Sequence, residues 1–377
     1  MKPKLSKQLV IRLFGQKKPC PDFNFEQVES ILIRPLGDAV GDAVINLAYA
    51  RQLKDMYPNL KLGILVTDRN KDIFAHSDLI DELIEKKPAN YLKHRKKWQL
   101  MLDFEEQLDS RSIIAASVLS PDAVMIFKKR DRKYYSMQNI RNYDFYCPYN
   151  PDNHVSEHLC TSKFAEYFTI PQPHSYLSIP EAEQNQVVPY WQENGSRKVR
   201  IYIAPQGSVK FKRLPENELA ELLNKCDKSL LPKVQFVMCN SKNSEEYFAR
   251  LKSLCDHDIP LILSPKTSLP QYVALTASSD IVIGVDSGTV HLACALSKPL
   301  LSFYTSHNIH SWSPLHNEGV PHLMVVAESG MRKSEDELAS WTAREKFPLD
   351  NATQWLNAQI SEQIAKHPVQ TSQPTTT

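Results

Sequence analysis

Short apolar segments of strand length alternate with helix patterns through most of this chain, and this alternation limits the fold more than any other feature. An apolar segment at 31–34 is followed by a helix pattern from Asp42 onward and by a second buried segment at 61–66. A strand–helix–strand order needs a right-handed crossover and therefore implies a parallel sheet. The alternation starts again at residue 199, with strands predicted at 234–238, 260–263, 281–284 and 299–303. We therefore predict an α/β protein with two Rossmann-like βα domains.

The length of 377 residues also favours two domains, because single cores rarely grow so large. Two consecutive βα domains would face each other across a cleft at the carboxyl ends of their strands, where open α/β folds bind ligands. Residues 180–197 are polar and rich in turn formers, as linkers are. The predicted divisions are a basic N-terminal extension (1–29), an N-terminal domain (30–185), a linker (186–198), a C-terminal domain (199–345), a helix packing back on the N-terminal domain (346–366) and a disordered tail (367–377).

Composition excludes several other classes of protein. The seven cysteines are scattered singly, which suits reduced thiols better than a disulfide framework or a zinc site. No segment approaches the roughly 18 apolar residues of a membrane span, and the start lacks the apolar core of a signal peptide. We therefore expect a cytoplasmic protein. Leu5, Leu9, Val10, Leu13 and Phe14 could line one face of a short basic helix, which would give weak contact with a membrane surface.

Two basic runs stand out, at 86–97 and 128–133. A solvated surface is the ordinary explanation, and attraction of an anionic substrate or membrane surface is the alternative. The runs lack interleaved aromatic stacking positions, so nucleic acid is not an expected partner.

The sharpest local pattern surrounds the predicted strand end at 284. Asp286, Ser287 and Gly288 lie at a turn from strand to helix, where free N–H groups and the positive end of the helix dipole suit a phosphate or diphosphate. Thr289 adds a hydroxyl. An ordinary N-cap explains Asp286 or Ser287 equally well, and His291 could be a satisfied buried histidine.

A second turn of this kind spans 204–215, again between a predicted strand and a predicted helix. Lys210, Lys212 and Arg213 place cations beside small residues, as a diphosphate site would, although a solvated basic loop has the same composition. Both turns fall on one edge of the second sheet, which makes the phosphate interpretation stronger than either turn alone.

The loop after the first strand repeats a Gly-Asp pair, at Gly37-Asp38 and Gly41-Asp42. It cannot be a dinucleotide fingerprint, because GxGxxG is absent and two acids stand where pyrophosphate would lie. Carboxylates at a helix start are usually capping groups. The functional alternative is a general base for transfer of a sugar to a hydroxyl, whose oxygen must lose its proton.

These residues resemble the lipopolysaccharide heptosyltransferases, the glycosyltransferases of family 9 that use ADP-heptose. The first strand, the Gly-Asp turn and a helix ending at Tyr57-Pro58 are similar to the start of that family. Asp286-Ser-Gly-Thr-Val-His-Leu-Ala293 resembles its Asp-Ser/Thr-Gly-x-x-His-Leu-Ala signature. Counted back from Tyr57, the family's catalytic aspartate falls on Asp42.

The resemblance implies a GT-B fold, with acceptor bound by the N-terminal domain and nucleotide sugar by the C-terminal one. It implies an inverting single displacement without an essential metal or cofactor, in which the co-substrate is ADP-heptose or a related nucleotide sugar. The acceptor would be a lipopolysaccharide or lipooligosaccharide core, reached at the inner face of the inner membrane.

The resemblance also assigns residues to roles. Asp42 would be the base, with Asp38 as its rival because the loop is longer than usual in the family. Donor-binding residues would be Gly207, Ser208 and Lys212 with Ser287, Gly288, Thr289 and His291 at the diphosphate, Asp286 at the sugar, Glu245 at the ribose and Thr267 near the adenine. Acceptor-binding residues would be Lys128, Lys129 and Arg130.

Departures from the family pattern keep alternatives open. The usual Asn-Pro-Gly-Ala is here Ala204-Pro-Gln-Gly207, and the usual Phe-Gly-Pro-Thr is replaced at 303–310. The alternatives are a GT-B transferase using another nucleotide sugar and a non-catalytic protein that binds anionic glycans.

Overall fold

The computed structural model describes residues 5–148, 150, 152–193, 197–209, 212–304, 309–327 and 346–366. The chain divides into two compact units, Met1–Tyr176 and Leu177–Thr377. Lys210, residues 305–308 of the replaced segment and the tail at 367–377 lie outside the described residues.

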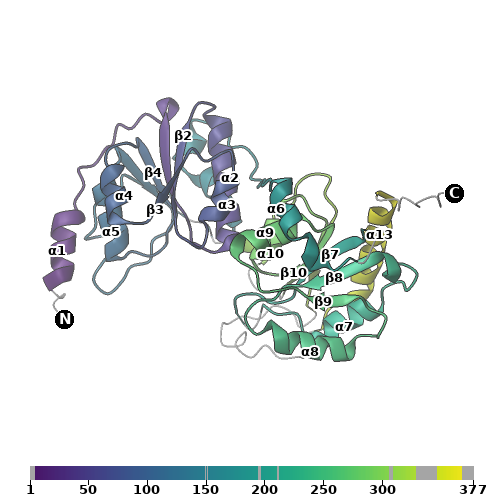
Figure 1. The fold of residues 1–377 in the computed structure, drawn as a ribbon. Helices are drawn as coiled ribbons and strands as arrows, with labels where there is room; N and C mark the ends of the chain where they lie inside the picture. The colour runs from purple at the N-terminus through teal and green to yellow at the C-terminus, as the bar shows by residue number, and fades with distance from the viewer. Residues whose placement is uncertain are drawn as a thin grey trace. The chain divides into compact units, whose positions relative to one another are not determined.

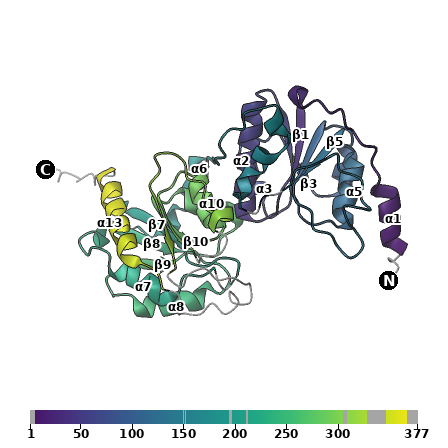
Figure 2. The ribbon, with the colours of Figure 1, turned by 180° about the vertical axis from the view of Figure 1, so that it is seen from behind.

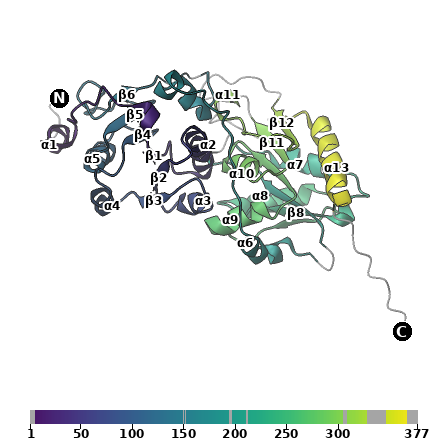
Figure 3. The same ribbon diagram turned by 90° about the horizontal axis from the view of Figure 1, so that it is seen from above.

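The first unit is built on a six-stranded parallel sheet (Figure 1), whose strand order β3-β2-β1-β4-β5-β6 can be followed in Figure 3. This is the doubly wound order, in which the chain reverses its direction of winding between β1 and β4. Leu62 and Leu100 lie opposite Ile31 on the two sides of β1. The strands are β1 (Ser30–Arg34), β2 (Lys61–Val66), β3 (Glu82–Glu85), β4 (Leu100–Asp103), β5 (Ala123–Ile126) and β6 (Phe145–Tyr146).

Helices cover both faces of this sheet (Figure 3). One face carries α2 (Val40–Met56) and α3 (Lys71–Ala75), and the other carries α4 (Pro88–Lys93) and α5 (Ser110–Leu119). The N-terminal helix α1 (Leu5–Phe14) packs on α5 (Figure 2). After β6 the chain forms two 3-10 segments, η2 (Val155–Thr161) and η3 (Lys163–Glu166), which are separate because Ser162 caps a new start with its hydroxyl at 3.3 Å from Phe164 N.

The second unit repeats the same winding order, β12-β11-β10-β7-β8-β9, in a second six-stranded parallel sheet. Its strands are β7 (Val199–Ala204), β8 (Val234–Met238), β9 (Leu261–Leu263), β10 (Ile281–Val285), β11 (Leu300–Tyr304) and β12 (His322–Val326). Its helices are α6 (Glu181–Gln186), α7 (Glu216–Asn224), α8 (Ser244–Leu254), α9 (Leu269–Ala277), α10 (Gly288–Ala295), α11 (Ile309–Trp312) and α13 (Leu349–Lys366). The predicted α/β class with two Rossmann-like units is confirmed.

Two of the predicted divisions are wrong. The supposed linker at 186–198 belongs to the second unit, because Trp191 is fully buried and its Nε1 donates to Ser278 Oγ at 3.0 Å. The final helix does not pack back on the first unit. Ala352, Leu356 and Ile360 of α13 are buried with the strands of the second unit, and α13 lies beside α7 and β12 (Figure 3). The spacing of apolar residues predicts that a helix has a buried face, but it does not predict which of the two sheets that face packs against.

A stack of parallel rings is buried in the first unit. Phe104 lies between Tyr49 and Phe127, with ring centroids 4.2 and 4.4 Å apart. The His158 ring continues the stack at 5.5 Å from Phe127. Burial, reinforced by the nearby Lys128 cation, lowers the pKa of His158 to about 4.

This buried histidine predicts a dependence of stability on pH. The unfolded chain protonates His158 near its ordinary pKa of about 6.5, whereas the folded chain does so only near 4, so stability falls as the pH drops through this window. Between pH 7 and pH 5 His158 should contribute about 2 kcal/mol to this loss, measured by urea unfolding as the difference between the wild type and a variant without this histidine. His158→Phe keeps a ring in the stack and should remove this part of the slope. His174→Gln, at an exposed histidine, should leave the slope unchanged.

Candidate functional site

The two predicted phosphate turns meet at the point where the second sheet reverses its winding. β7 and β10 are hydrogen-bonded neighbours, with Ala204 opposite Gly284 at their carboxyl ends. The loop after β7 and the start of α10 therefore lie at the same crevice, which is the usual ligand position in a doubly wound sheet.

The loop after β7 folds back on itself and brings a cation to this crevice. Gln206 and Arg213 form an antiparallel bridge, and Gly207 N donates to Lys212 O at 2.5 Å. Lys212 Nζ then lies 2.8 Å from Asp286 Oδ2. A Cβ atom at Gly207 would lie 2.6 Å from Lys212 Cβ and 3.1 Å from Asp286 O, so this approach requires glycine. Ser208 is exposed beside it.

Within the described residues, no side chain caps the first backbone N–H groups of α10. Ser287 is the N-cap residue, with extended backbone, and its side chain makes no cap hydrogen bond. Its Oγ is buried and finds no hydrogen-bond partner in the described part of the chain. Thr289 Oγ1 lies 2.6 Å from Tyr272 OH, and the buried His291 ring meets the edge of Trp312. Gly288 starts the helix, whose first N–H groups can receive an oxyanion.

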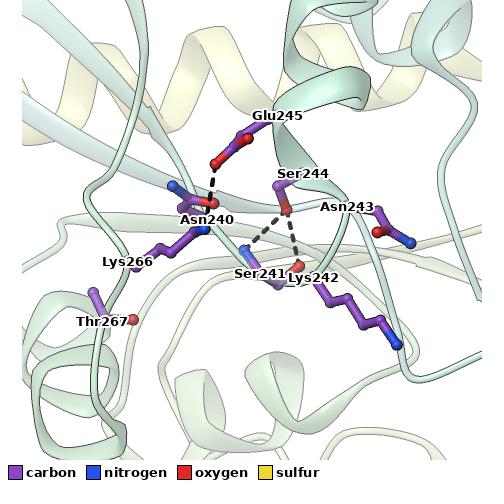
Figure 4. A pocket seen from close by; sticks show the side chains of 8 residues that line it. All are labelled: Asn240, Ser241, Lys242, Asn243, Ser244, Glu245, Lys266 and Thr267. Atoms are coloured by element: carbon purple, nitrogen blue, oxygen red, sulfur yellow. Dashed lines mark hydrogen bonds and ion pairs between the residues drawn. The ribbon is translucent and has the colours of Figure 1, made fainter.

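A separate hollow of about 530 Å³ opens after β8 and β9 and brings Glu245 and Thr267 together (Figure 4). Asn240 donates through Nδ2 to Ser264 O at 3.1 Å, which fixes one wall. Glu245 and Lys266 form an exposed ion pair at 3.4 Å across the hollow. The lining residues are Asn240, Ser241, Lys242, Asn243, Ser244, Glu245, Lys266 and Thr267.

In the first unit, the two candidate bases lie in different environments at the winding reversal beside β1. Asp42 is the third residue of α2, and its Oδ2 accepts from Ala39 N at 3.1 Å. A Cβ atom at Gly37 would fall 2.0 Å from Asp42 Oδ2, so the missing side chain makes room for this carboxylate. Asp38 instead pairs with Arg69 Nη1 at 2.8 Å.

The predicted acceptor-binding cations are placed less uniformly than expected. Lys128 and Arg130 both pair with Glu106, at 2.9 and 2.7 Å. The Lys129 side chain has no exposed surface and lies 2.9 Å from Asp103 Oδ2, so its expected position on the solvated surface is wrong. Its neighbours in sequence face outward, while Lys129 is held inward by a buried carboxylate at the end of β4.

The other members of this buried group have no distinctive pattern in the sequence. Arg34 ends β1, lies 3.7 Å from Asp103, and has Nε and Nη1 without hydrogen-bond partners among the described residues. Burial alone would raise the pKa of Asp103, but Lys129 and Arg34 together hold it below the ordinary value. Burial lowers the pKa of Lys86, and burial raises that of Glu105. The one feature of the sequence that indicates this group is the position of its charged residues at the ends of apolar strands.

No helix in the described residues is long and apolar enough to cross a membrane. Within those same residues, His, Cys, Asp and Glu side chains do not gather in a group of three that would hold a metal ion.

Comparison with known proteins agrees with this architecture. The lipopolysaccharide core heptosyltransferase OpsX of Haemophilus influenzae is 24% identical over 310 residues, covering 78% of this chain and 84% of that protein. The solved structure of E. coli ADP-heptose lps heptosyltransferase II superposes with a TM-score of 0.66 at 17% identity, over 89% of this chain and 99% of that one. E. coli heptosyltransferase WaaC with ADP gives a TM-score of 0.60 at 15% identity, over 88% and 99%. These structural likenesses show the GT-B fold.

The family model described as glycosyltransferase family 9 (heptosyltransferase) matches residues 90–340, well over half of the chain. The matched region contains both turns at the crevice of the second sheet and the hollow after β8 and β9. The chain is therefore a glycosyltransferase and belongs to glycosyltransferase family 9.

Proposed function

We propose that this enzyme transfers a heptose from ADP-heptose to a lipopolysaccharide or lipooligosaccharide core acceptor, by an inverting single displacement. The observation that carries the proposal is the meeting of Gly207, Lys212 and Asp286 at the uncapped start of α10. The names of its relatives support the substrate class, since one is a core heptosyltransferase and one solved structure is named for ADP-heptose.

The diphosphate of the donor would lie at this crevice. Lys212 supplies a cation, and the first N–H groups of α10 supply donors at the positive end of the helix. Ser208, Ser287 and Thr289 add hydroxyls. Asp286 holds Lys212 at 2.8 Å and can in turn accept from sugar hydroxyls. Charge developing on the leaving diphosphate is thus met by groups already in place.

The nucleoside would occupy the hollow after β8 and β9. Glu245 can accept hydrogen bonds from ribose hydroxyls. Thr267, in the loop after β9, lines the same hollow. The Glu245–Lys266 pair is exposed, and exposed pairs of this kind contribute little, so a ribose can compete for the carboxylate at small cost. One solved structure of similar fold is named as a heptosyltransferase with ADP, which supports ADP as the nucleotide.

The acceptor side of the reaction is assigned to the first unit. Asp42 would take the proton from the attacking hydroxyl as the oxygen bonds to the anomeric carbon and the nucleoside diphosphate leaves. Lys128 and Arg130 would contribute to attraction of an anionic core, tempered by their shared partner Glu106. We place the enzyme in the cytoplasm, in peripheral contact with the inner face of the inner membrane.

A different nucleotide sugar is the second candidate, because the sequence departs from its family at Ala204–Gly207, beside the proposed diphosphate. The decisive experiment incubates the purified chain with ADP-heptose and truncated core acceptors and follows the product by mass spectrometry. Heptose addition is expected, and it should persist in EDTA, since Lys212 and α10 supply the positive charge that a metal would otherwise bring. Transfer only from UDP- or GDP-linked sugars would overturn the donor assignment.

Replacing Lys212 by glutamine should lower kcat/KM for the donor by about 10²-fold, because one charged contact to the diphosphate is lost. The thermal shift produced by ADP should shrink with it, since a ligand raises the midpoint according to its affinity for the folded state. Lys266→Gln removes an equal charge from the rim of the nucleoside hollow and should change kcat/KM less than about threefold. Equal effects of the two variants would place the diphosphate elsewhere.

A further inference from the structure

The N-terminal helix α1 has two apolar faces, of which only one is packed. Val10, Ile11 and Phe14 lie against the cluster of Leu108, Ile113, Tyr135 and Ile140. The expectation that Val10 and Phe14 share a face with the three leucines of this helix is therefore wrong. The leucine ridge, formed by Leu5, Leu9 and Leu13, points away from α5 and is 83%, 56% and 59% exposed.

The leucine ridge is continuous, because residues four apart lie one above the other on a helix. Arg12 is exposed on the same side of the helix. An exposed apolar row beside a cation is the pattern of a helix that lies in a membrane interface, with its apolar side chains at the boundary of the acyl chains.

A hollow of about 630 Å³ adjoins the packed side of α1, between the start of α5 and residues 132–135. It collects four cations, Lys7, Arg111, Arg132 and Lys133. In the part of the chain that the structure describes, no carboxylate lies within 4.0 Å of any of the four. The one acid in its lining, Asp109, already accepts from Ser112 N at 2.8 Å. We call these four residues the cation hollow.

We propose that the leucine ridge, with Arg12 beside it, is a docking surface for an anionic lipid bilayer, and that the cation hollow on the packed side of α1 adds to the positive field that attracts the bilayer. The leucines enter the interface and Arg12 meets lipid phosphates, while the cations of the hollow attract the anionic surface over a distance of about a Debye length. Lys7 donates to Ser110 Oγ and Arg132 to Gln107 Oε1, but these neutral partners leave the positive charge uncompensated. A second copy of the chain is therefore disfavoured as the occupant, because it would bring two sets of uncompensated cations together. This inference rests on the proposed function only for its purpose, which is to hold the enzyme where a lipid-linked acceptor lies.

The test uses the full chain in flotation with vesicles of phosphatidylglycerol and phosphatidylethanolamine, compared with phosphatidylcholine alone. The chain should float with the anionic vesicles, release as salt is raised, and stay behind with the neutral ones. Flotation independent of lipid charge would overturn the role of the cation hollow, and absence of flotation would overturn the whole surface.

The triple variant Leu5→Gln, Leu9→Gln, Leu13→Gln should lose at least about tenfold in partitioning, since burial of these side chains drives interfacial binding. Its matched control is Leu92→Gln with Leu254→Gln, at leucines that are 62% and 48% exposed in other helices. The control should float like wild type. If the triple variant instead converts a dimer to a monomer in light scattering and floats normally, the ridge covers a second copy and the proposal fails.

The charge test replaces Arg132 and Lys133 by glutamine, and should weaken partitioning about tenfold at low salt, since each cation near an anionic surface is worth several-fold. Lys93→Gln with Arg95→Gln removes the same charge from another exposed basic run and should have little effect. Equal losses in the two variants would show general electrostatic attraction rather than binding by this surface.

Transfer to a soluble truncated acceptor should be unchanged in the leucine variant. Flotation without transfer would refute the proposed function alone, and transfer without flotation would refute this inference alone.

Discussion

Replacing Asp42 by asparagine is expected to lower kcat by about 10²–10⁴-fold, because an amide cannot take the proton of the acceptor hydroxyl. The fold should survive. The asparagine side-chain oxygen can still accept from Ala39 N, as Asp42 Oδ2 does at 3.1 Å, so the start of α2 keeps its cap. The measurement is ADP release with saturating ADP-heptose and a truncated core acceptor, together with the thermal midpoint of each variant.

Asp38→Asn is the matched control, in the same loop and with the same change of charge. Asp38 is already paired with Arg69 at 2.8 Å, so its carboxylate would have to leave this partner before it could reach an acceptor hydroxyl. Its loss should therefore change kcat only a few-fold. If Asp38→Asn abolished transfer and Asp42→Asn did not, the assignment would be reversed. Normal transfer by both variants would exclude general-base catalysis from this loop.

A glycine in the loop supplies an independent check on Asp42. A Cβ atom at Gly37 would lie 2.0 Å from Asp42 Oδ2, so Gly37→Ala must push the carboxylate aside. We expect Gly37→Ala to reduce kcat in the same direction as Asp42→Asn, although every titratable group is retained. The double variant should then be little worse than Asp42→Asn, since the two changes act on one group.

The parts of the fold that depend on chain order were predictable from sequence. Apolar strands alternating with helices allow few arrangements, and the right-handed crossover makes the sheets parallel. It follows that loops after neighbouring strands meet at one edge, and Gly207, Lys212 and Asp286 do lie together there. Glu245 and Thr267 share a hollow for the same reason.

Edge strands and connections were harder to predict. Glu82–Glu85 forms β3 at the sheet edge, yet its two acids interrupt the apolar run, so the segment lacks the pattern of a buried strand. Charges are common on edge strands because they discourage pairing with another chain. Trp191 stands in a polar stretch whose composition is that of a linker, and only the position of Ser278 in the folded chain shows why it is buried.

Burial of a charge depends on a partner that is distant in sequence, and Lys129 is the clearest case. Its neighbours Lys128 and Arg130 share the exposed environment that the basic run predicted. The partner of Lys129 is Asp103, on another strand, and no spacing rule links the two. Arg34 joins them from a third strand, so the group exists only once β1, β4 and β5 are side by side.

Lys129→Met should therefore act on stability rather than on acceptor affinity. It leaves the buried Asp103 carboxylate with only Arg34, at 3.7 Å, and removing one partner of a buried pair costs about 3–5 kcal/mol. That is a large share of the roughly 5–15 kcal/mol by which folded proteins are stable. Urea unfolding of the variant and the wild type measures this loss in free energy of unfolding. Lys128→Met, one residue away in an exposed pair, should cost about 0–1 kcal/mol.

The pH dependence of that loss separates a buried carboxylate from a simple packing defect. In the wild-type chain the cations hold the pKa of Asp103 below its ordinary value, so the pair stabilises above the unfolded pKa and this contribution fades as the pH falls. Without Lys129, burial dominates and the pKa of Asp103 should rise, so the folded variant takes up a proton that the wild type does not. The stability deficit of Lys129→Met should therefore shrink between pH 7 and pH 4, whereas a cavity left by a lost side chain would give the same deficit at every pH. A deficit near zero at neutral pH, with a raised KM for the acceptor, would instead return Lys129 to the surface role that the basic run suggested.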